Sequence, residues 1–340
     1  MADDNSKVTC ANPECRVGET GKCVEGLVLS ECPHYGSAQE SAEGIEGIED
    51  QADTGRREAI TLPSGELLSV KEAASLLRRG EARVIALIGP TEAGKTTLVA
   101  SLYDLFQRGP VDDFQFRRSE TLYAFERGCH EARAASQRAT PHTKRTPIGS
   151  GVGFFHLGLC GAKDVALEVV LSDRAGEEYR AAGDDPSVAR DFTEVLRADV
   201  LTMLVDGERL LDLGARHNVR SEVEMTLQAL LDGDVLSEGQ RLAVVLTKAD
   251  LIEESAQRDR ANADFTRLAE NVRRLFGSVF RTIEPFQVAA SPSTTIVPRG
   301  YGLSDLLGFW TAPTTIVPAR VLPLRLPARA MERIQAVRDE

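Results

Sequence analysis

The chain has 340 residues, of which 42% are hydrophobic and 27% are charged, and its formal net charge is -12 at pH 7. This length leaves room for one large domain or two smaller ones, and the hydrophobic fraction is enough for a sizeable core. The acidic balance argues against a general nucleic-acid-binding protein, which would be basic over its binding face. No stretch approaches the roughly 18 uninterrupted apolar residues of a membrane span.

The N-terminal part of the chain separates into two segments of different composition. Residues 1–35 hold four of the six cysteines and begin with the acidic, polar stretch MADDNSKVTC. This start lacks the basic and apolar stretches of a secretory signal, so we expect a cytoplasmic protein with reduced thiols. Residues 36–57 are rich in Gly, Ser and Glu and contain no aromatic residue, which predicts a flexible acidic linker.

The cysteines of residues 1–35 suggest a zinc site. They are Cys10, Cys15, Cys23 and Cys32, in the spacing C-x4-C-x7-C-x8-C. In a reducing compartment, four thiols this close indicate a tetrahedral Zn²⁺ site, with His34 able to replace one of them. Because a tight C-x-x-C knuckle is missing, unligated or redox-active cysteines are the alternative. A zinc module of this size is typical of docking or structural elements, and the acidic surroundings disfavour a nucleic-acid-binding role.

From residue 58 onward the pattern predicts a layered α/β domain. Residues 58–82 form a lead-in, with a hairpin around residues 63–65 and a helix from an N-cap at Ser69 to Gly80. Apolar runs at 84–88, 165–171, 200–205 and 242–246 predict strands buried on both faces. They alternate with helical spacing, first at 98–106, which favours a P-loop NTPase three-layer sandwich with a mostly parallel sheet.

We assign residues 83–311 to this domain and 312–340 to a C-terminal tail with a helix near 328–338. Residues 110–147 form a long insertion with its own helix at 119–138, ahead of a strand at 151–159.

A phosphate-binding loop follows the first apolar run. The stretch GPTEAGKT has the spacing G-x-x-x-x-G-K-T between a strand and a helix, where backbone N–H groups and the helix dipole favour phosphate. Lys95 is predicted to reach the β and γ phosphates, and the Thr96 hydroxyl to hold Mg²⁺. The predicted phosphate contacts are Gly89, Thr91, Glu92, Ala93, Gly94, Lys95, Thr96 and Thr97.

Two later stretches indicate which nucleotide binds. VVLSDRAGEEY places Asp173 at a strand end, where it can hold Mg²⁺ through water, and Gly176, whose N–H can bond the γ-phosphate. AVVLTKAD places Thr247, Lys248 and Asp250 at the end of a later strand. A carboxylate there can accept both N1–H and the exocyclic amine of guanine, a donor pair that adenine lacks.

The ordered stretches GPTEAGKT, DRAGEE and TKAD resemble the Ras-like GTPases of the TRAFAC class over roughly residues 83–311. The resemblance implies binding of GTP and GDP with Mg²⁺ and a two-state switch. It carries a guanine-supporting role over to Ala290 and Ser291, and a switch threonine to Thr146, with Thr143 and Thr140 as alternatives. The insertion and the Cys-rich N-terminus look most like the bacterial double-GTPase group, which implies partner proteins of a GTPase-associated system.

The sequence departs from the Ras-like pattern at the catalytic positions. Glu177 stands where a glutamine usually orients the attacking water, and its charge would face the γ-phosphate, so we expect slow intrinsic hydrolysis. Thr91 could hinder an external arginine finger, and Arg145 is a candidate internal one. The leading hypothesis is a GTPase switch. The alternatives are a guanine-nucleotide-binding scaffold without turnover and an ATP-dependent P-loop protein.

Overall fold

The computed structural model describes residues 63–137, 149, 151–161, 164–292 and 296–313, and the isolated positions 28 and 30. The chain divides into two compact units, Met1–Ile60 and Thr61–Glu340, and nearly all described residues belong to the second. Apart from the isolated positions, the Cys-rich segment and the linker lie outside the described residues, and so does the predicted tail helix.

A seven-stranded sheet forms the centre of the second unit, in the order β2-β3-β4-β1-β5-β6-β7. The strands are β1 (Ala82–Ile88), β2 (Gln115–Arg118), β3 (Gly153–Cys160), β4 (Ala166–Asp173), β5 (Val200–Asp206), β6 (Arg241–Thr247) and β7 (Thr282–Gln287). Strands β4, β1, β5, β6 and β7 are parallel, whereas β2 and β3 add an antiparallel edge. The prediction of an α/β fold with a mostly parallel sheet is therefore confirmed.

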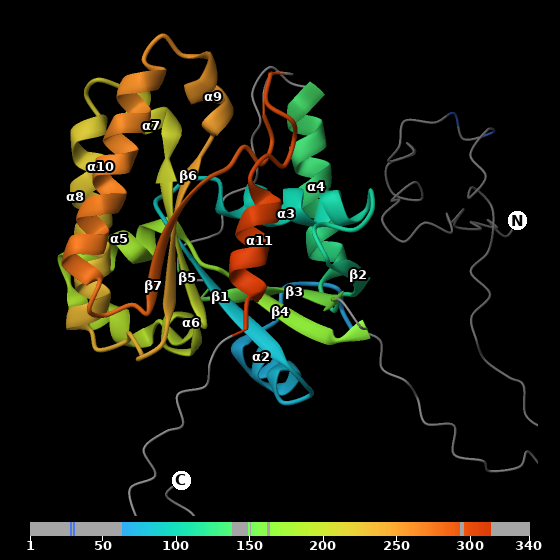
Figure 1. The fold of residues 1–340 in the computed structure, drawn as a ribbon. Helices are drawn as coiled ribbons and strands as arrows, with labels where there is room; N and C mark the ends of the chain where they lie inside the picture. Colours follow the sequence, from blue (N-terminus) through green and yellow to red (C-terminus); the bar gives the residue numbers. More distant parts are fainter. Residues whose placement is uncertain are drawn as a thin grey trace, which may run out of the picture. The chain divides into compact units, whose positions relative to one another are not determined.

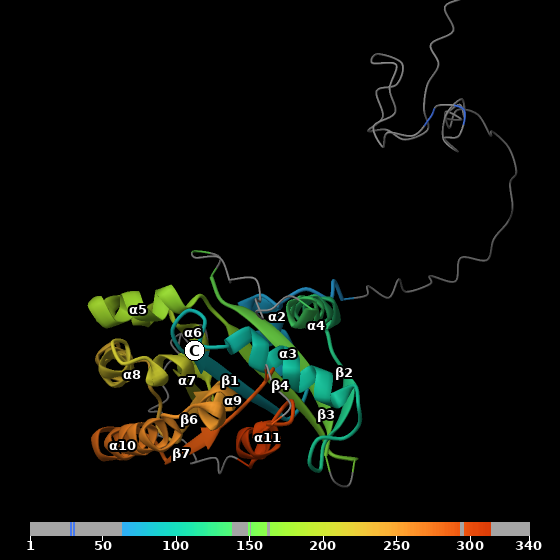
Figure 2. The ribbon, with the colours of Figure 1, turned by 90° about the horizontal axis from the view of Figure 1, so that it is seen from above.

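Helices cover both faces of this sheet (Figures 1 and 2). On one face lie α3 (Lys95–Phe106), α4 (Leu122–Gln137) and α11 (Leu303–Thr311); on the other lie α5 (Gly176–Asp184), α8 (Arg216–Asp232) and α10 (Arg258–Phe276). Shorter helices within the connections are η3 (Pro186–Asp191), α6 (Thr193–Arg197), α7 (Gly207–Leu211) and α9 (Ala249–Glu254). Successive strand residues point to opposite faces, so Ile85 joins the core beneath α3 while Ala86 joins the core beneath α8.

The lead-in packs against the antiparallel edge of the sheet. Helix α2 (Val70–Leu77) begins at the predicted N-cap Ser69, which forms a capping box with Glu72, and its C-cap is Arg78, two residues before the predicted end at Gly80. Leu68, after the predicted hairpin turn, pairs in both hydrogen-bond directions with Phe154 of β3. The arm of the hairpin before the turn lies outside the described residues, so the hairpin stays a prediction, while Leu68 finds a long-range partner in β3.

Two edge strands were not predicted from the sequence. Strand β2 has only four residues, and β7 contains Pro285 and an exposed Glu284, so neither shows the apolar run of a buried strand. A proline is tolerated there because an edge strand has one side without a partner strand. The predicted insertion helix is present as α4, and the predicted strands at 84–88, 165–171, 200–205 and 242–246 match β1, β4, β5 and β6.

A buried histidine links strands β3 and β4 to the loop before α4. The imidazole of His156 is fully buried; its Nδ1 accepts a hydrogen bond from the Glu120 backbone N–H at 2.9 Å, and its Nε2 lies 2.6 Å from Glu168 Oε2. These contacts favour the neutral tautomer with the proton on Nε2. Burial lowers the pKa of His156, against the opposing effect of Glu168, and Arg118 lowers it further while Glu120 raises it.

The lowered pKa of His156 predicts that the protein loses stability on mild acidification. Because the folded-state pKa lies below the unfolded value of about 6.5, the folded protein binds fewer protons than the unfolded chain. The stabilising effect is present above pH 6.5 and is lost as the pH falls below it. We expect the free energy of unfolding, measured in urea, to decrease less in His156→Asn than in the wild type when the pH is lowered from 7.5 to 5.5. Equal slopes in the two proteins would contradict this account.

Candidate functional site

The phosphate-binding loop lies between the end of β1 at Ile88 and the start of α3 at Lys95. The loop turns through two left-handed residues, Glu92 with φ 65° and Gly94 with φ 89°. Glycine adopts this conformation without strain, whereas a glutamate in it is strained, and such strain is found preferentially at functional sites. The loop therefore departs from a glycine-rich one at Glu92 while keeping the backbone path that exposes N–H groups at a helix start.

Lys95 is held inside this loop by two backbone carbonyls. Its Nζ donates to Gly89 O at 2.9 Å and to Pro90 O at 3.1 Å. Burial lowers the pKa of Lys95 to about 8, and the carboxylates of Asp173 and Glu177 oppose this shift. A buried ammonium group at a helix N-terminus provides strong attraction for an anion.

The loop meets the end of β4 through Thr96 and Asp173. Because β4 is the parallel neighbour of β1, the carboxyl ends of both strands reach the same edge of the sheet. The Thr96 hydroxyl lies 3.5 Å from Asp173 Oδ1. Oxygen groups of this kind suit Mg²⁺, which is usually held by one or two protein groups, phosphate oxygens and water. Among the described residues, no group of three or more His, Cys, Asp or Glu side chains could hold a metal ion. The hydroxyl and carboxylate oxygens of Thr96 and Asp173 fit a magnesium ion that nucleotide phosphates help to bind.

Gly176, the first residue of α5, lies directly on the phosphate-binding loop. A Cβ atom at this position would come within 2.4 Å of Thr91 N and 2.6 Å of the Pro90 carbonyl carbon. Only glycine allows the two backbone segments to approach this closely. Glu177 follows at the next position and is partly buried. A group bound between the loop and α5 would therefore change the position of α5.

Arg174 anchors α5 to α6 through a buried ion pair. Its guanidinium donates through Nε to Glu194 Oε1 at 2.6 Å and through Nη2 to Glu194 Oε2 at 3.0 Å, and it also pairs with Glu178. Tyr179 donates to the same Glu194 carboxylate at 3.1 Å, and the guanidinium lies 4.6 Å from the centre of the Phe192 ring. Burial lowers the pKa of Arg174, but the two carboxylates outweigh it, so the pKa is raised. Sequence analysis missed this network, because no local pattern pairs residue 174 with residue 194.

The TKAD stretch occupies the end of β6 and the start of α9. Thr247 ends the strand, Lys248 is left-handed with φ 54°, and Asp250 is buried in the first turn of α9. Lys248 Nζ pairs with Asp206 Oδ2 at 3.0 Å and with Glu208 Oε2 at 2.8 Å. Burial lowers the pKa of Lys248, but these carboxylates raise it by more.

Asp206, which ends β5 and is buried, was not singled out from the sequence. The signal that drew attention to Asp173, an acidic residue at the end of an apolar run, also applies to it.

The loop after β7 joins this region. Ala249 N donates to Val288 O at 3.1 Å, and Val288 N donates to Leu246 O at 2.8 Å. Ala249, Ala289 and Val297 form a small buried cluster. The structure thus brings the segment that holds Ala290 and Ser291, both partly buried, beside the TKAD stretch.

Several predicted site residues lie outside the described residues. They are the switch threonine Thr146 with its alternatives Thr143 and Thr140, the candidate finger Arg145, and the candidate zinc ligands Cys10, Cys15, Cys23, Cys32 and His34. No helix in the described ranges is long and apolar enough to cross a membrane.

The comparison with protein families decides the assignment. The family description Double-GTPase 2 matches residues 83–311, about two thirds of the chain. The protein belongs to the Double-GTPase 2 family. The resemblance to TRAFAC-class P-loop GTPases of the double-GTPase group, drawn from the motifs, is thereby confirmed. Membership of this GTPase family supports guanine-nucleotide binding by this Double-GTPase 2 protein.

Solved structures similar to this Double-GTPase 2 protein include three whose descriptions name GTP or a GTP analogue. The signal recognition particle receptor SRb-GTP/SRX complex from Chaetomium thermophilum shares 16% identity over 67% of this chain and 97% of that one, with a TM-score of 0.37. The GTP-bound GTPase-like domain of S. cerevisiae Ski7 shares 16% identity over 71% of this chain and 52% of that one, with a TM-score of 0.39. Elongation factor SelB from Methanococcus maripaludis, in complex with the GTP analogue GppNHp, shares 14% identity over 70% of this chain and 36% of that one, with a TM-score of 0.34. A comparison with curated proteins finds no match.

Proposed function

We propose that this protein is a GTP-binding molecular switch that hydrolyses GTP slowly with the help of Mg²⁺. The observation that carries the proposal is the meeting of the phosphate-binding loop with the end of β4. There Thr96 lies 3.5 Å from Asp173, and Gly176 touches the loop backbone. Family membership and the TKAD stretch support guanine as the base of the bound nucleotide.

Each of these residues has a role that follows from its chemistry. Lys95 leaves the carbonyls of Gly89 and Pro90 and binds the β and γ phosphates, where its positive charge offsets theirs. Thr96 and Asp173 would hold Mg²⁺, Thr96 with its hydroxyl and Asp173 with its carboxylate. The metal, when bound, neutralises phosphate charge that develops during transfer. The Gly176 N–H donates to the γ-phosphate.

Hydrolysis is slow in this proposal because of Glu177. A glutamine at this position would orient water without charge, whereas a carboxylate repels the γ-phosphate. A carboxylate can still orient or deprotonate a water molecule, so the reaction is not abolished.

The switch consists of α5 and the segment before β3. Release of phosphate removes the bond to Gly176, and α5 then changes its position on the loop. Glu178 of α5 accepts a hydrogen bond from Gly149 N at 3.1 Å, which connects α5 to the segment that holds the predicted switch threonine. A protein effector of an associated system would bind to the part of this surface that changes. The proposed location of the protein is the cytoplasm.

Single-turnover hydrolysis tests the proposal. With enzyme in excess over radiolabelled GTP and with Mg²⁺ present, the wild type is expected to release phosphate. Lys95→Ala and Asp173→Ala are expected to reduce the rate by about 10²-fold or more, because each removes charge stabilisation of the transition state. Lys71→Ala, which changes an exposed lysine of α2, serves as the matched control. GTP binding without phosphate release from the wild type would replace the proposal with the scaffold without turnover.

A further inference from the structure

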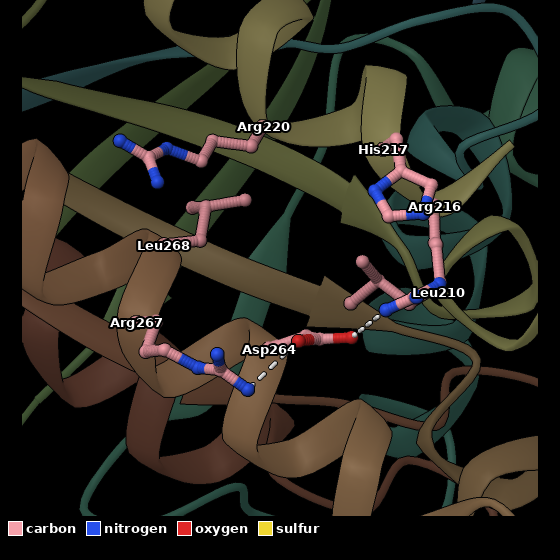
Figure 3. Close-up of a pocket in the computed structure, with 7 residues that line it drawn as sticks. All are labelled: Leu210, Arg216, His217, Arg220, Asp264, Arg267 and Leu268. Atoms are coloured by element: carbon pink, nitrogen blue, oxygen red, sulfur yellow. Dashed lines mark hydrogen bonds and ion pairs between the residues drawn. The ribbon is translucent and has the colours of Figure 1, made fainter.

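A pocket with a volume of about 140 Å³ opens between α7, α8 and α10 (Figure 3). It is lined by Leu210, Arg216, His217, Arg220, Asp264, Arg267 and Leu268. None of these residues belongs to the phosphate-binding loop, the DRAG stretch or the TKAD stretch, so the pocket is separate from the proposed nucleotide site. Its volume has room for several water molecules.

The charges around this pocket do not balance. Three guanidinium groups share the one carboxylate of Asp264: Arg267 at 3.1 Å, Arg216 at 3.3 Å and Arg260 at 3.7 Å. Figure 3 shows the Asp264 carboxylate between the guanidinium groups of Arg216 and Arg267. Within the part of the chain that the structure describes, these three guanidinium groups form ion pairs with no other carboxylate, so the cluster carries two excess positive charges.

The remaining arginine of the pocket does not change this balance. Arg220 pairs with Glu224 on its own helix at 2.6 Å, and Glu224 is held in turn by Asn271. That pair is neutral as a unit, and the excess positive charge lies around Asp264.

One donor at this pocket lacks a partner. Arg216 Nε is buried and makes no hydrogen bond within the part of the chain that the structure describes. A buried N–H group without an acceptor is costly, and a bound anion would satisfy it. Arg216 is also the first residue of α8. Just before this helix the Asp212 carboxylate accepts the Gly214 and Ala215 N–H groups at 2.7 Å each, so the helix start itself adds little to the positive field.

We propose that this pocket binds the phosphate group of a small phosphate compound. A phosphate monoester carries a charge of about -1.5 to -2 at neutral pH, which matches the two excess positive charges. Planar guanidinium groups donate pairs of hydrogen bonds to phosphate oxygens, and Arg267 is exposed enough to meet an entering ligand. Asp264 holds the arginines in place and at the same time weakens binding by its own negative charge.

The role of Asp264 allows a test with two opposite outcomes. Full-length protein saturated with GDP and Mg²⁺ is titrated with inorganic phosphate by isothermal calorimetry at constant ionic strength. The wild type is expected to bind phosphate. Arg267→Gln is expected to weaken binding about tenfold or more, because it removes a charged hydrogen-bond donor. Asp264→Asn is expected to tighten binding severalfold, because it removes the repelling charge.

Controls separate this pocket from the nucleotide site. Arg274→Gln changes an exposed arginine of the same helix outside the pocket and is expected to bind as the wild type does. Repeating the series in a Lys95→Ala background tests the pocket even if the protein binds no GDP. A parallel titration with O-phosphoserine distinguishes a monoester ligand, which binds more tightly than inorganic phosphate, from free phosphate itself. Absence of binding in both the wild type and Asp264→Asn, or equal affinity in all variants, would overturn the proposal.

Discussion

Replacing Asp250 with alanine is expected to abolish the preference for guanine over adenine nucleotides. The carboxylate lies buried in the first turn of α9, beside the loop that holds Ala290 and Ser291. Two hydrogen bonds from guanine to a carboxylate are worth roughly 3–6 kcal/mol together, so the affinity for GDP should fall on the order of 10²- to 10⁴-fold. Competition of fluorescent GDP by GTP, GDP and ATP, with Mg²⁺ present, measures the change.

The control for this prediction lies on the same helix. Glu254 is exposed on α9, and Glu254→Ala should leave all three affinities unchanged. If ATP competes with the wild type as strongly as GTP does, or if Asp250→Ala keeps its preference for guanine, then TKAD does not recognise the base. In the first of these cases the protein would be an ATP-dependent P-loop protein; in the second, other residues would recognise guanine.

Replacing Glu194 with alanine is expected to lower the free energy of unfolding by about 3–5 kcal/mol, because it leaves the guanidinium of Arg174 buried without its bidentate partner. Both side chains are almost fully buried, and Tyr179 loses its acceptor as well. Urea unfolding, followed by the fluorescence of the single tryptophan, Trp310, gives the value. That tryptophan is buried against β5, where its Nε1 donates to Thr202, so it reports on the sheet core.

A surface ion pair provides the comparison for Glu194. Glu222 accepts two hydrogen bonds from Arg209 but is 39% exposed, so Glu222→Ala should cost less than about 1 kcal/mol. The double variant Arg174→Ala with Glu194→Ala should cost less than the sum of the single changes. If Glu194→Ala costs no more than Glu222→Ala, the buried pair does not stabilise the link between α5 and α6.

The amino-acid sequence alone determined the parts of this protein that depend on neighbouring residues. The apolar runs of β1, β4, β5 and β6 are long enough to predict buried strands, and the G-x-x-x-x-G-K-T spacing predicts the turn from β1 into α3. The motif order P-loop, D-x-x-G and T-K-x-D predicts the family, which the match to residues 83–311 confirms. Each apolar run and each motif is a short local stretch of chain, where spacing and side-chain type suffice, and the family follows from the order of the motifs along the chain.

The tertiary structure decided which distant residues become partners. Lys248 pairs with Asp206 across 42 positions, and Arg174 pairs with Glu194 across 20. Arg216 and Arg267 share Asp264 because α8 and α10 lie side by side on one face of the sheet. Strands β2 and β7 were also decided here, since an edge strand needs only one partner and little apolar character. The physical reason is the same in each case: contacts between distant residues follow from strand order and helix placement, which no local pattern encodes.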